Sequence, residues 1–276
     1  MPAVPLSSLH ATAFVTGASA GLGRAFTDML LAEGVRVWGT ARDPARLASL
    51  AAHPNFTAVV LDLRDGPAVE QVFADASVSA GGFDLVINNA GYGVFAGALE
   101  ADADVWHGQL EDMLQTTLRL GRAALCGMRP RGRGCLVNVS SLAVEFPLPY
   151  MSGYNVAKAG LSAWSESLAY ELAGTDVRVI DLRPGDFQTG FNRSAARGSG
   201  GDAPAAARVW ARLGRNLDEA PLPAHAAADL RRALLARRGG IVRTGSFFQA
   251  RLAPLLSRLA PWSWRHAVQK KFFHLS

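Results

Sequence analysis

The chain has 276 residues, of which 49% are hydrophobic, and it carries a formal net charge of +5 with a sequence pI of about 9.7. Its arginines are spread along the chain without ordered aromatic residues between them. This composition argues against nucleic-acid binding and indicates a solvated basic surface. No apolar run is long enough to span a bilayer, and residues 1–10 lack the basic and apolar regions of a secretory signal.

The two cysteines, Cys126 and Cys135, do not have the spacing of metal ligands. We therefore expect no metal site, and a reducing compartment such as the cytoplasm. α/β chains of this length routinely form one domain, so a single domain over residues 1–276 is predicted.

Apolar, β-branched runs alternate with amphipathic stretches along the chain. Strands are expected near residues 12–16, 35–40, 57–61, 84–87, 134–139, 177–182 and 241–244. Helices are expected near residues 22–33, 44–51, 67–78, 102–128, 152–173 and 224–237. This alternation predicts an α/β fold, in which a doubly wound parallel sheet is covered by helices on both faces.

The first strand runs directly into a glycine-rich turn, and an amphipathic stretch from Arg24 to Glu33 follows. Strand, glycine-rich turn and helix together present bare backbone N–H groups and a helix N-terminus to a pyrophosphate. A tight turn without a ligand is the alternative interpretation of this segment. The candidate cofactor-binding residues of the turn are Gly17, Ser19, Gly21, Leu22 and Gly23.

Three further predicted strands end in polar groups or glycine-containing turns. In open α/β sheets, ligands bind at the carboxyl ends of the strands. The candidate cofactor-binding residues at these ends are Asp62, Leu63, Asn89, Ala90, Gly91, Pro184, Gly185 and Thr189.

Tyr154 and Lys158 are four residues apart in a helix-forming run, so their side chains lie on the same helix face. An ammonium group beside a phenol favours the phenolate and is expected to lower the pKa of the tyrosine. Ser141 ends a predicted strand and could hold a carbonyl oxygen while the phenol exchanges a proton with it. A half-buried tyrosine beside a solvated lysine is the alternative.

These motifs resemble those of the short-chain dehydrogenase/reductase family, and they occur in the family's order from about residue 10 to about residue 190. The matching motifs are Thr16-Gly17-x-x-x-Gly21-x-Gly23, Asn88-Asn89-Ala90-Gly91, Ser141, Tyr154-x-x-x-Lys158 and Pro184-Gly185 with Thr189. The resemblance implies a Rossmann fold with seven strands in the order 3-2-1-4-5-6-7.

The resemblance also implies roles for these residues in hydride transfer between a nicotinamide cofactor and an alcohol or ketone. Tyr154 would be the acid/base, and Ser141 would polarise the substrate carbonyl. Lys158 and Tyr154 would also contact the cofactor, with Lys158 holding the nicotinamide ribose. Thr189 would orient the nicotinamide carboxamide.

The end of the second predicted strand indicates which dinucleotide the protein prefers. A carboxylate at this position selects the unphosphorylated cofactor, whereas the chain has Ala41 followed by Arg42. A guanidinium can hold a 2′-phosphate, so NADP(H) is predicted. Asp43 is expected to cap the helix that begins at Pro44. Arg24 could lie near the phosphates or on the helix surface.

One position departs from the family pattern. Met113 stands where many relatives have an asparagine that helps hold a water in a proton relay behind the lysine. A thioether cannot donate a hydrogen bond, so Gln115 or a backbone carbonyl would have to hold the water instead. The alternative function is a non-catalytic NADP(H)-binding redox sensor on the same fold.

Apolar residues near the expected pocket predict a hydrophobic alcohol or ketone as substrate. They are Leu142, Val144, Phe146, Leu148, Tyr150, Phe187 and Phe191. A substrate lid is expected over about residues 190–222, where Arg193 to Ala207 is low in complexity; a surface insertion is the alternative.

The last segment, about residues 247–276, combines apolar and aromatic residues at helical spacing with basic residues. We expect it to cover the pocket or to pack across a homo-oligomer, either a homodimer or a homotetramer. Peripheral contact with a membrane is the alternative that this pattern leaves open.

Overall fold

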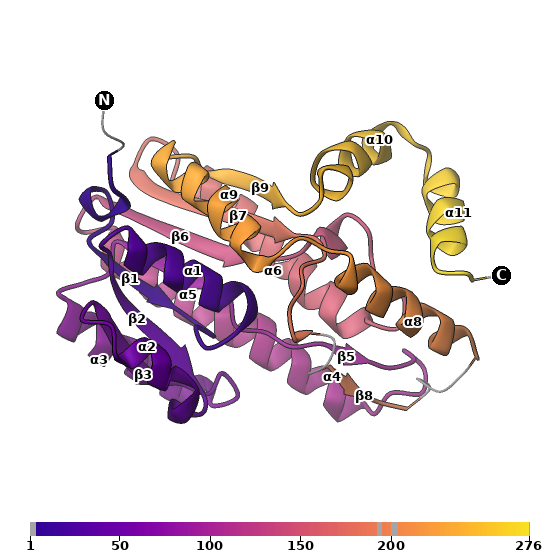
Figure 1. Ribbon diagram of the computed structural model, residues 1–276, viewed down its shortest axis with the longest axis horizontal. Coiled ribbons are helices and arrows are strands. Elements are labelled where there is room, and N and C mark those ends of the chain that lie inside the picture. The colour runs from indigo at the N-terminus through magenta and orange to yellow at the C-terminus, as the bar shows by residue number, and fades with distance from the viewer. Residues whose placement is uncertain (1–3, 192–194, 200–203, 276) are drawn as a thin grey trace.

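The computed structural model describes residues 4–191, 195–199 and 204–275 (Figure 1). Seven parallel strands form one sheet in the order β3-β2-β1-β4-β6-β7-β9. These strands are β1 (Thr12–Val15), β2 (Arg36–Ala41), β3 (Phe56–Val60), β4 (Leu85–Asn88), β6 (Arg133–Val139), β7 (Asp176–Pro184) and β9 (Gly240–Thr244). Because β5 (Val94–Phe95) and β8 (Ala196–Arg197) form a separate two-stranded sheet, the order of the seven strands equals the predicted 3-2-1-4-5-6-7, and the predicted fold is confirmed.

Helices cover both faces of the sheet because successive strand residues point to opposite faces. Val15 packs in one core with Phe26, whereas Phe14 packs in a second core with Phe73. The first core includes α1 (Gly21–Ala32), α2 (Ala48–Ala51) and α9 (Pro223–Leu235). The second includes α3 (Gly66–Ala80), α5 (Thr116–Met128) and α6 (Ser152–Glu171).

The strand order reverses at β1. Phe14 pairs with Trp38 of β2 on one side and with Val86 of β4 on the other. The connections from β1 and β4 therefore leave toward opposite faces, and a crevice opens at the carboxyl ends of these strands. The fold brings the predicted motifs together at this edge.

The expected helix 102–128 is interrupted. It consists of α4 (Ala103–Leu110), a π-helical turn at Glu111–Gln115, and α5. Such turns are rare and occur often at functional sites. Met113 lies at the centre of this turn.

The predicted lid region contains a helix that we did not expect, α8 (Pro204–Asp218). Ala206, Val209 and Leu213 are buried at helical spacing, so the alanine-rich end of the low-complexity stretch is a helix. Before it, β8 (Ala196–Arg197) pairs in parallel with β5 (Val94–Phe95). Residues 192–194 and 200–203 of the expected lid lie outside the described residues.

The C-terminal segment follows β9 as a π-helical turn at Phe248–Leu252, α10 (Ala253–Leu259) and α11 (Trp262–Phe272). Figure 1 shows α10 and α11 standing away from the sheet, with the end of α11 near α8. There the Arg208 side chain donates a hydrogen bond to the His274 carbonyl at 3.0 Å. None of the helices in the described ranges is long and apolar enough to cross a membrane.

Candidate active site

A cavity of about 1250 Å³ lies at the carboxyl ends of the strands. Ser141, Tyr154 and Lys158 line it together. It is also lined by the predicted cofactor-binding residues Gly17, Ser19, Gly21, Leu22, Arg42, Asp62, Leu63, Asn89, Ala90, Gly91, Pro184, Gly185 and Thr189. One cavity thus collects residues from the ends of six strands and from α6.

Gly23 is the one predicted cofactor-binding residue that does not line this cavity. A Cβ atom at Gly23 would lie 2.2 Å from the Gly17 carbonyl oxygen and 2.4 Å from Asn89 Nδ2. Its lack of a side chain lets α1 pack directly under the glycine-rich turn. The structure gives Gly23 a packing position, not a cavity-facing one.

The glycine-rich turn has the shape that a dinucleotide requires. Gly17 and Gly21 have φ angles of +68° and +54°, which favour glycine. The N-terminus of α1 has no side-chain cap, so its first N–H groups are free of a capping oxygen at the cavity wall. A phosphate-bearing cofactor fits this combination of bare backbone and helix N-terminus.

Thr16 ties the glycine-rich turn to the end of β4. Its Oγ1 accepts hydrogen bonds from the backbone N–H groups of Asn89 and Ala90, both at 2.9 Å. In return, Asn89 Nδ2 donates to the Thr16 carbonyl at 2.9 Å. These bonds fix the two turns that would face the cofactor from adjacent strands.

The part of the cavity beside the ends of β2 and β3 is basic. Arg42 follows β2, and Arg46 and Arg64 line the same cavity. Asp62 bonds to Arg64 at 3.0 Å, and this hydrogen bond lowers the pKa of Asp62. Asp43 caps the following 3₁₀ turn by accepting from Ala45 N at 2.9 Å, as predicted. Arg46 and Arg64 are candidate phosphate contacts that the sequence motifs did not single out.

Arg24 does not take part in this basic end. It bonds to Asp28 at 2.9 Å, one turn along α1, and to Ser49 Oγ at 3.0 Å. Of the two roles left open by the sequence, the structure therefore gives Arg24 the helix-surface role.

The three candidate catalytic residues are all buried in the cavity wall. Lys158 Nζ donates to the Val139 carbonyl at 2.7 Å and lies 5.9 Å from the centre of the Tyr154 ring. Ser141 begins a 3₁₀ turn and accepts from Ala143 N at 3.0 Å through its Oγ. The side chains are thus positioned by β6 and α6, which are rigid elements of the fold.

The expected lowering of the Tyr154 pKa is wrong for this structure. Burial raises the pKa of Tyr154 to about 12; a hydrogen bond from Ser141 opposes this rise, and the charge of Asp186 adds to it. Burial lowers the pKa of Lys158 to about 8, and Asp181 opposes that shift. The pKa is raised because burial desolvates the phenol, an effect that the spacing of Tyr154 and Lys158 in the sequence does not reveal.

A buried ionic network lies behind Ser141. Arg183 on β7 bonds to Asp181 at 2.8 Å and to Glu145 at 2.7 Å. Asp181 also accepts from the Ser140 and Ser162 hydroxyls. The network joins β7, α6 and the segment that carries Ser141, so it holds the serine against the tyrosine helix.

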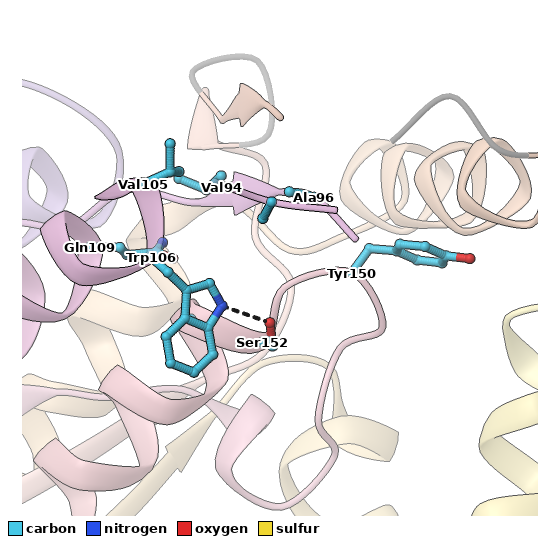
Figure 2. Close-up of a pocket in the computed structure, with 9 residues that line it drawn as sticks. Val94, Ala96, Val105, Trp106, Gln109, Tyr150 and Ser152 are labelled. Carbon is cyan, nitrogen blue, oxygen red and sulfur yellow. Dashed lines mark hydrogen bonds between the residues drawn. The ribbon is translucent and has the colours of Figure 1, made fainter. Parts of the chain in front are cut away.

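The helix α4 supports the tyrosine helix from the other side (Figure 2). Trp106 Nε1 donates to the Oγ of Ser152, the first residue of α6, at 3.1 Å. Val94, Gln109 and Tyr150 border a small cavity beside this bond. Its volume of about 10 Å³ is at most enough for one water molecule, so the helices are packed closely here.

The surroundings of Met113 do not include the side chain of Gln115, one of the two expected substitutes for the family's asparagine. Gln115 is exposed, so its side chain is not buried beside the lysine. Gln109 is buried instead and donates to Met113 Sδ at 3.7 Å. A Cβ atom at Gly91 would lie 3.1 Å from Met113 Cε and 3.6 Å from Lys158 Nζ, so the thioether lies near the lysine.

The substrate half of the cavity is mostly apolar. Of the expected pocket residues, Leu142, Phe146, Leu148, Phe187 and Phe191 line the cavity. Tyr150 lines the small cavity beside α4, and Val144 lines neither.

Two polar residues of the substrate half, Asp186 and Gln249, were not predicted. Asp186 directly follows the Pro184-Gly185 motif, which is the signal that could have found it. Gln249 comes from the C-terminal segment and has no motif of its own.

Comparisons with known proteins agree with this arrangement. The family model for short chain dehydrogenase matches residues 11–199. The chain is 33% identical over 178 residues to a 3-ketodihydrosphingosine reductase of Bacteroides thetaiotaomicron, covering 64% of each chain. It is 30% identical over 184 residues to the 3-oxoacyl-[acyl-carrier-protein] reductase of Escherichia coli, covering 66% of this chain and 75% of that one.

Solved structures share most of the architecture. A short-chain dehydrogenase from Streptomyces avermitilis is 31% identical, with a TM-score of 0.79 over 93% of this chain and 97% of that one. The closed form of a serine dehydrogenase complexed with NADP⁺ is 26% identical, with a TM-score of 0.73 over 85% of this chain and 94% of that one. The protein belongs to the short-chain dehydrogenase/reductase family of oxidoreductases, whose cofactor is a nicotinamide dinucleotide.

Proposed function

We propose that this protein is an NADP(H)-dependent carbonyl reductase, or alcohol dehydrogenase in the reverse direction, that acts on an apolar ketone or alcohol. The observation that carries the proposal is the convergence of Ser141, Tyr154 and Lys158 in the wall of one cavity that also holds Arg42. A hydroxyl, a phenol and an ammonium around one space can bind and protonate a carbonyl oxygen.

In the proposed reaction, the bound dinucleotide supplies the hydride for the substrate carbon. The Tyr154 hydroxyl donates its proton to the substrate oxygen. Because burial raises the pKa of this phenol to about 12, Tyr154 is protonated at neutral pH and ready to donate. Ser141 donates a hydrogen bond to the same oxygen and fixes the position of the carbonyl. Lys158 would hold the nicotinamide ribose of the bound cofactor.

Preference for the 2′-phosphorylated cofactor is supported by charge. Three arginines line the cavity after the ends of β2 and β3: Arg42, Arg46 and Arg64. Asp43 is engaged as a turn cap, and Asp62 is paired with Arg64. A guanidinium that faces a phosphate dianion forms charge-assisted hydrogen bonds, which are about twice as strong as neutral ones.

The substrate class is supported by the lining and by the relatives. Apolar side chains such as Phe146, Phe187 and Phe191 favour an apolar ligand. Two relatives are named as reductases of a 3-keto and a 3-oxo compound. We infer that the substrate is a ketone carried on an apolar skeleton.

The test is a screen of apolar ketones that follows NADPH oxidation, with NADH measured in parallel. Turnover of at least one ketone, lost in Tyr154→Phe, is the expected result. Met113 favours the second candidate, the redox sensor, because it replaces a relay residue of the family. Binding of NADPH without turnover of any ketone, and without any effect of Tyr154→Phe, would establish the sensor instead.

We further propose one catalytic domain over residues 1–276, with a substrate lid over about residues 190–222. A homodimer or homotetramer in the cytoplasm is proposed as the working form. The free thiols of Cys126 and Cys135 agree with a reducing compartment. Sedimentation equilibrium measures the oligomeric state directly.

A further inference from the structure

The segment of residues 247–272, here called the C-terminal surface, exposes apolar side chains to an unusual degree. Ten of the nineteen large apolar residues that are exposed on the described chain belong to it. They are Phe247, Phe248, Leu252, Leu255, Leu256, Leu259, Trp262, Trp264, Val268 and Phe272. Such a concentration of exposed apolar residues on one segment is typical of an interaction site.

The helix α10 presents its apolar side outward. Pro254 is buried beneath it, whereas Leu252, Leu255 and Leu259 recur at spacings of three and four residues and are 39%, 60% and 81% exposed. A surface helix of a globular protein normally turns such a stripe toward the core. The stripe on α10 therefore requires something outside this chain to cover it.

The helix α11 has no buried side chain between Trp262 and Phe272, and its two tryptophans are 68% and 70% exposed. An isolated helix of 11 residues is marginally stable in water, so packing on one face normally stabilises it. Tryptophan combines a large apolar ring with one N–H donor, and it is enriched where an apolar phase meets water.

The same segment holds the whole net charge of the protein. Residues 245–276 contain five basic side chains, Arg251, Arg258, Arg265, Lys270 and Lys271, and no acidic one. The remaining 23 basic residues are balanced by 23 acidic residues. None of the five is ion-paired within the described ranges, so their charge is available to an anionic partner.

We propose that the C-terminal surface docks the protein on an anionic lipid bilayer. Leucines and tryptophans would enter the interfacial layer, and the arginines and lysines beside them would meet lipid phosphates. A second copy of the chain is a poorer occupant, because a two-fold contact would set five positive charges against the same five. The sequence left this role open as the alternative, and the outward leucine stripe now favours it.

The C-terminal surface also lies next to the proposed substrate site; this step rests on the proposed function. Phe248, Val268 and Phe272 belong to the C-terminal surface and also line the cavity that holds Tyr154. Phe273, next along the chain, is buried in the same hydrophobic cluster as Tyr154. Part of the segment therefore borders the cavity. An apolar ketone dissolved in the bilayer could pass between these side chains into the cavity.

The test is co-sedimentation of the full-length protein with phosphatidylcholine vesicles that contain or lack phosphatidylglycerol. Binding to the anionic vesicles only, weakened by high salt, is the expected result. The charge-reversing pair Arg265→Glu and Lys271→Glu should weaken binding by roughly tenfold or more. Its control, Arg129→Glu with Arg238→Glu, changes the net charge equally at exposed sites elsewhere and should bind like wild type.

A second pair of variants tests the apolar contribution. Trp264→Ser with Leu259→Ser should weaken vesicle binding, whereas Leu99→Ser with Val78→Ser, at similarly exposed positions elsewhere, should not. Equal binding of both pairs, or no binding by wild type, would overturn the proposal. So would self-association in sedimentation equilibrium that Arg265→Glu and Lys271→Glu abolish.

NADPH affinity, measured on the same variants, separates this proposal from the proposed function. If a variant loses vesicle binding but still binds NADPH, the result bears on the membrane proposal and leaves the proposed function untouched. No substituted residue of these variants lines the cavity, so their NADPH affinity should equal that of wild type.

Discussion

Gln249 Nε2 donates a hydrogen bond to Asp186 Oδ2 at 2.6 Å, and Gln249 Oε1 accepts from Asp186 N at 3.3 Å. This double contact ties the start of the C-terminal segment to the loop that follows β7. A Cβ atom at Gly185 would lie 2.7 Å from Gln249 Oε1, so the glycine makes the contact possible. The C-terminal segment is therefore part of the cavity wall and shapes the surroundings of Tyr154.

Asp186→Asn should shift the pH dependence of alcohol oxidation toward lower pH. Oxidation requires the Tyr154 phenolate, and the Asp186 carboxylate adds to the raised pKa of this phenol. Without the negative charge, the phenolate forms at lower pH. The rate of NADP⁺ reduction, measured against pH, checks this shift.

The control for this shift is Asp176→Asn at the opposite end of the same strand, which should leave the profile in place. An unchanged profile in Asp186→Asn would mean that this carboxylate does not act on Tyr154.

Arg42→Asp should weaken NADPH binding and turn the preference toward NADH. Loss of a charge-assisted phosphate contact costs about 1.5–3 kcal/mol, which is roughly a 10- to 150-fold increase in Kd. Quenching or enhancement of nicotinamide fluorescence measures both dissociation constants. Arg24→Ala is the matched control, because Arg24 is paired with Asp28 on the surface of α1. Equal losses in the two variants would sink the assignment of Arg42.

Arg183→Met should destabilise the fold by about 3–5 kcal/mol, because it leaves the buried Asp181 carboxylate without its guanidinium, whereas Glu145 keeps its ion pair with Arg243. Urea denaturation measures the loss. The exposed pair of Arg237 and Asp176 supplies the control, and Arg237→Met should change stability by less than about 1 kcal/mol. A variant at Arg183 as stable as this control would show that the network is not required for folding.

The free energy of unfolding should decrease in mild acid because His10 is buried in its neutral form. Burial, aided by the charge of Arg178, lowers the pKa of His10 from 6.5 to about 4. Between these values the unfolded chain binds a proton that the folded chain does not, so the free energy of unfolding decreases as the pH falls from 6.5 to 4. The expected contribution at pH 4 is on the order of 3 kcal/mol.

The comparison for His10 is His10→Leu, which removes the titrating ring. Its free energy of unfolding should fall less steeply than that of wild type over the same pH range, while the slopes above pH 7 agree. Parallel curves down to pH 4 would show that His10 titrates normally.

The sheet and most of the site could be predicted because their causes are local. Strands such as β1 and β4 are short, apolar and buried on both faces, so their sequences are readable. The carboxyl ends of parallel strands meet at one edge, so the motifs at Gly17, Asn89 and Gly185 had to converge. Of the predicted cofactor-binding residues, only Gly23 lies under the glycine-rich turn and not at the cavity, because close packing of α1 there requires a glycine.

The unpredicted features depend on contacts between distant segments. The strands β5 and β8 have two residues each and pair about a hundred positions apart, which no local pattern reveals. The contact of Gln249 with Asp186 joins segments 63 residues apart. The pKa of Tyr154 depends on desolvation by the assembled cavity, whereas the sequence showed only the charge of its neighbour Lys158.

The most direct test of the central claim is NADPH oxidation by wild type and by Tyr154→Phe with the same apolar ketone. The substitution removes only the hydroxyl, so the fold and the NADPH affinity should be retained while turnover falls by roughly 10²- to 10⁴-fold. Retention of most of the turnover in Tyr154→Phe would contradict the assignment of Tyr154 as the proton donor and, with it, the proposed mechanism.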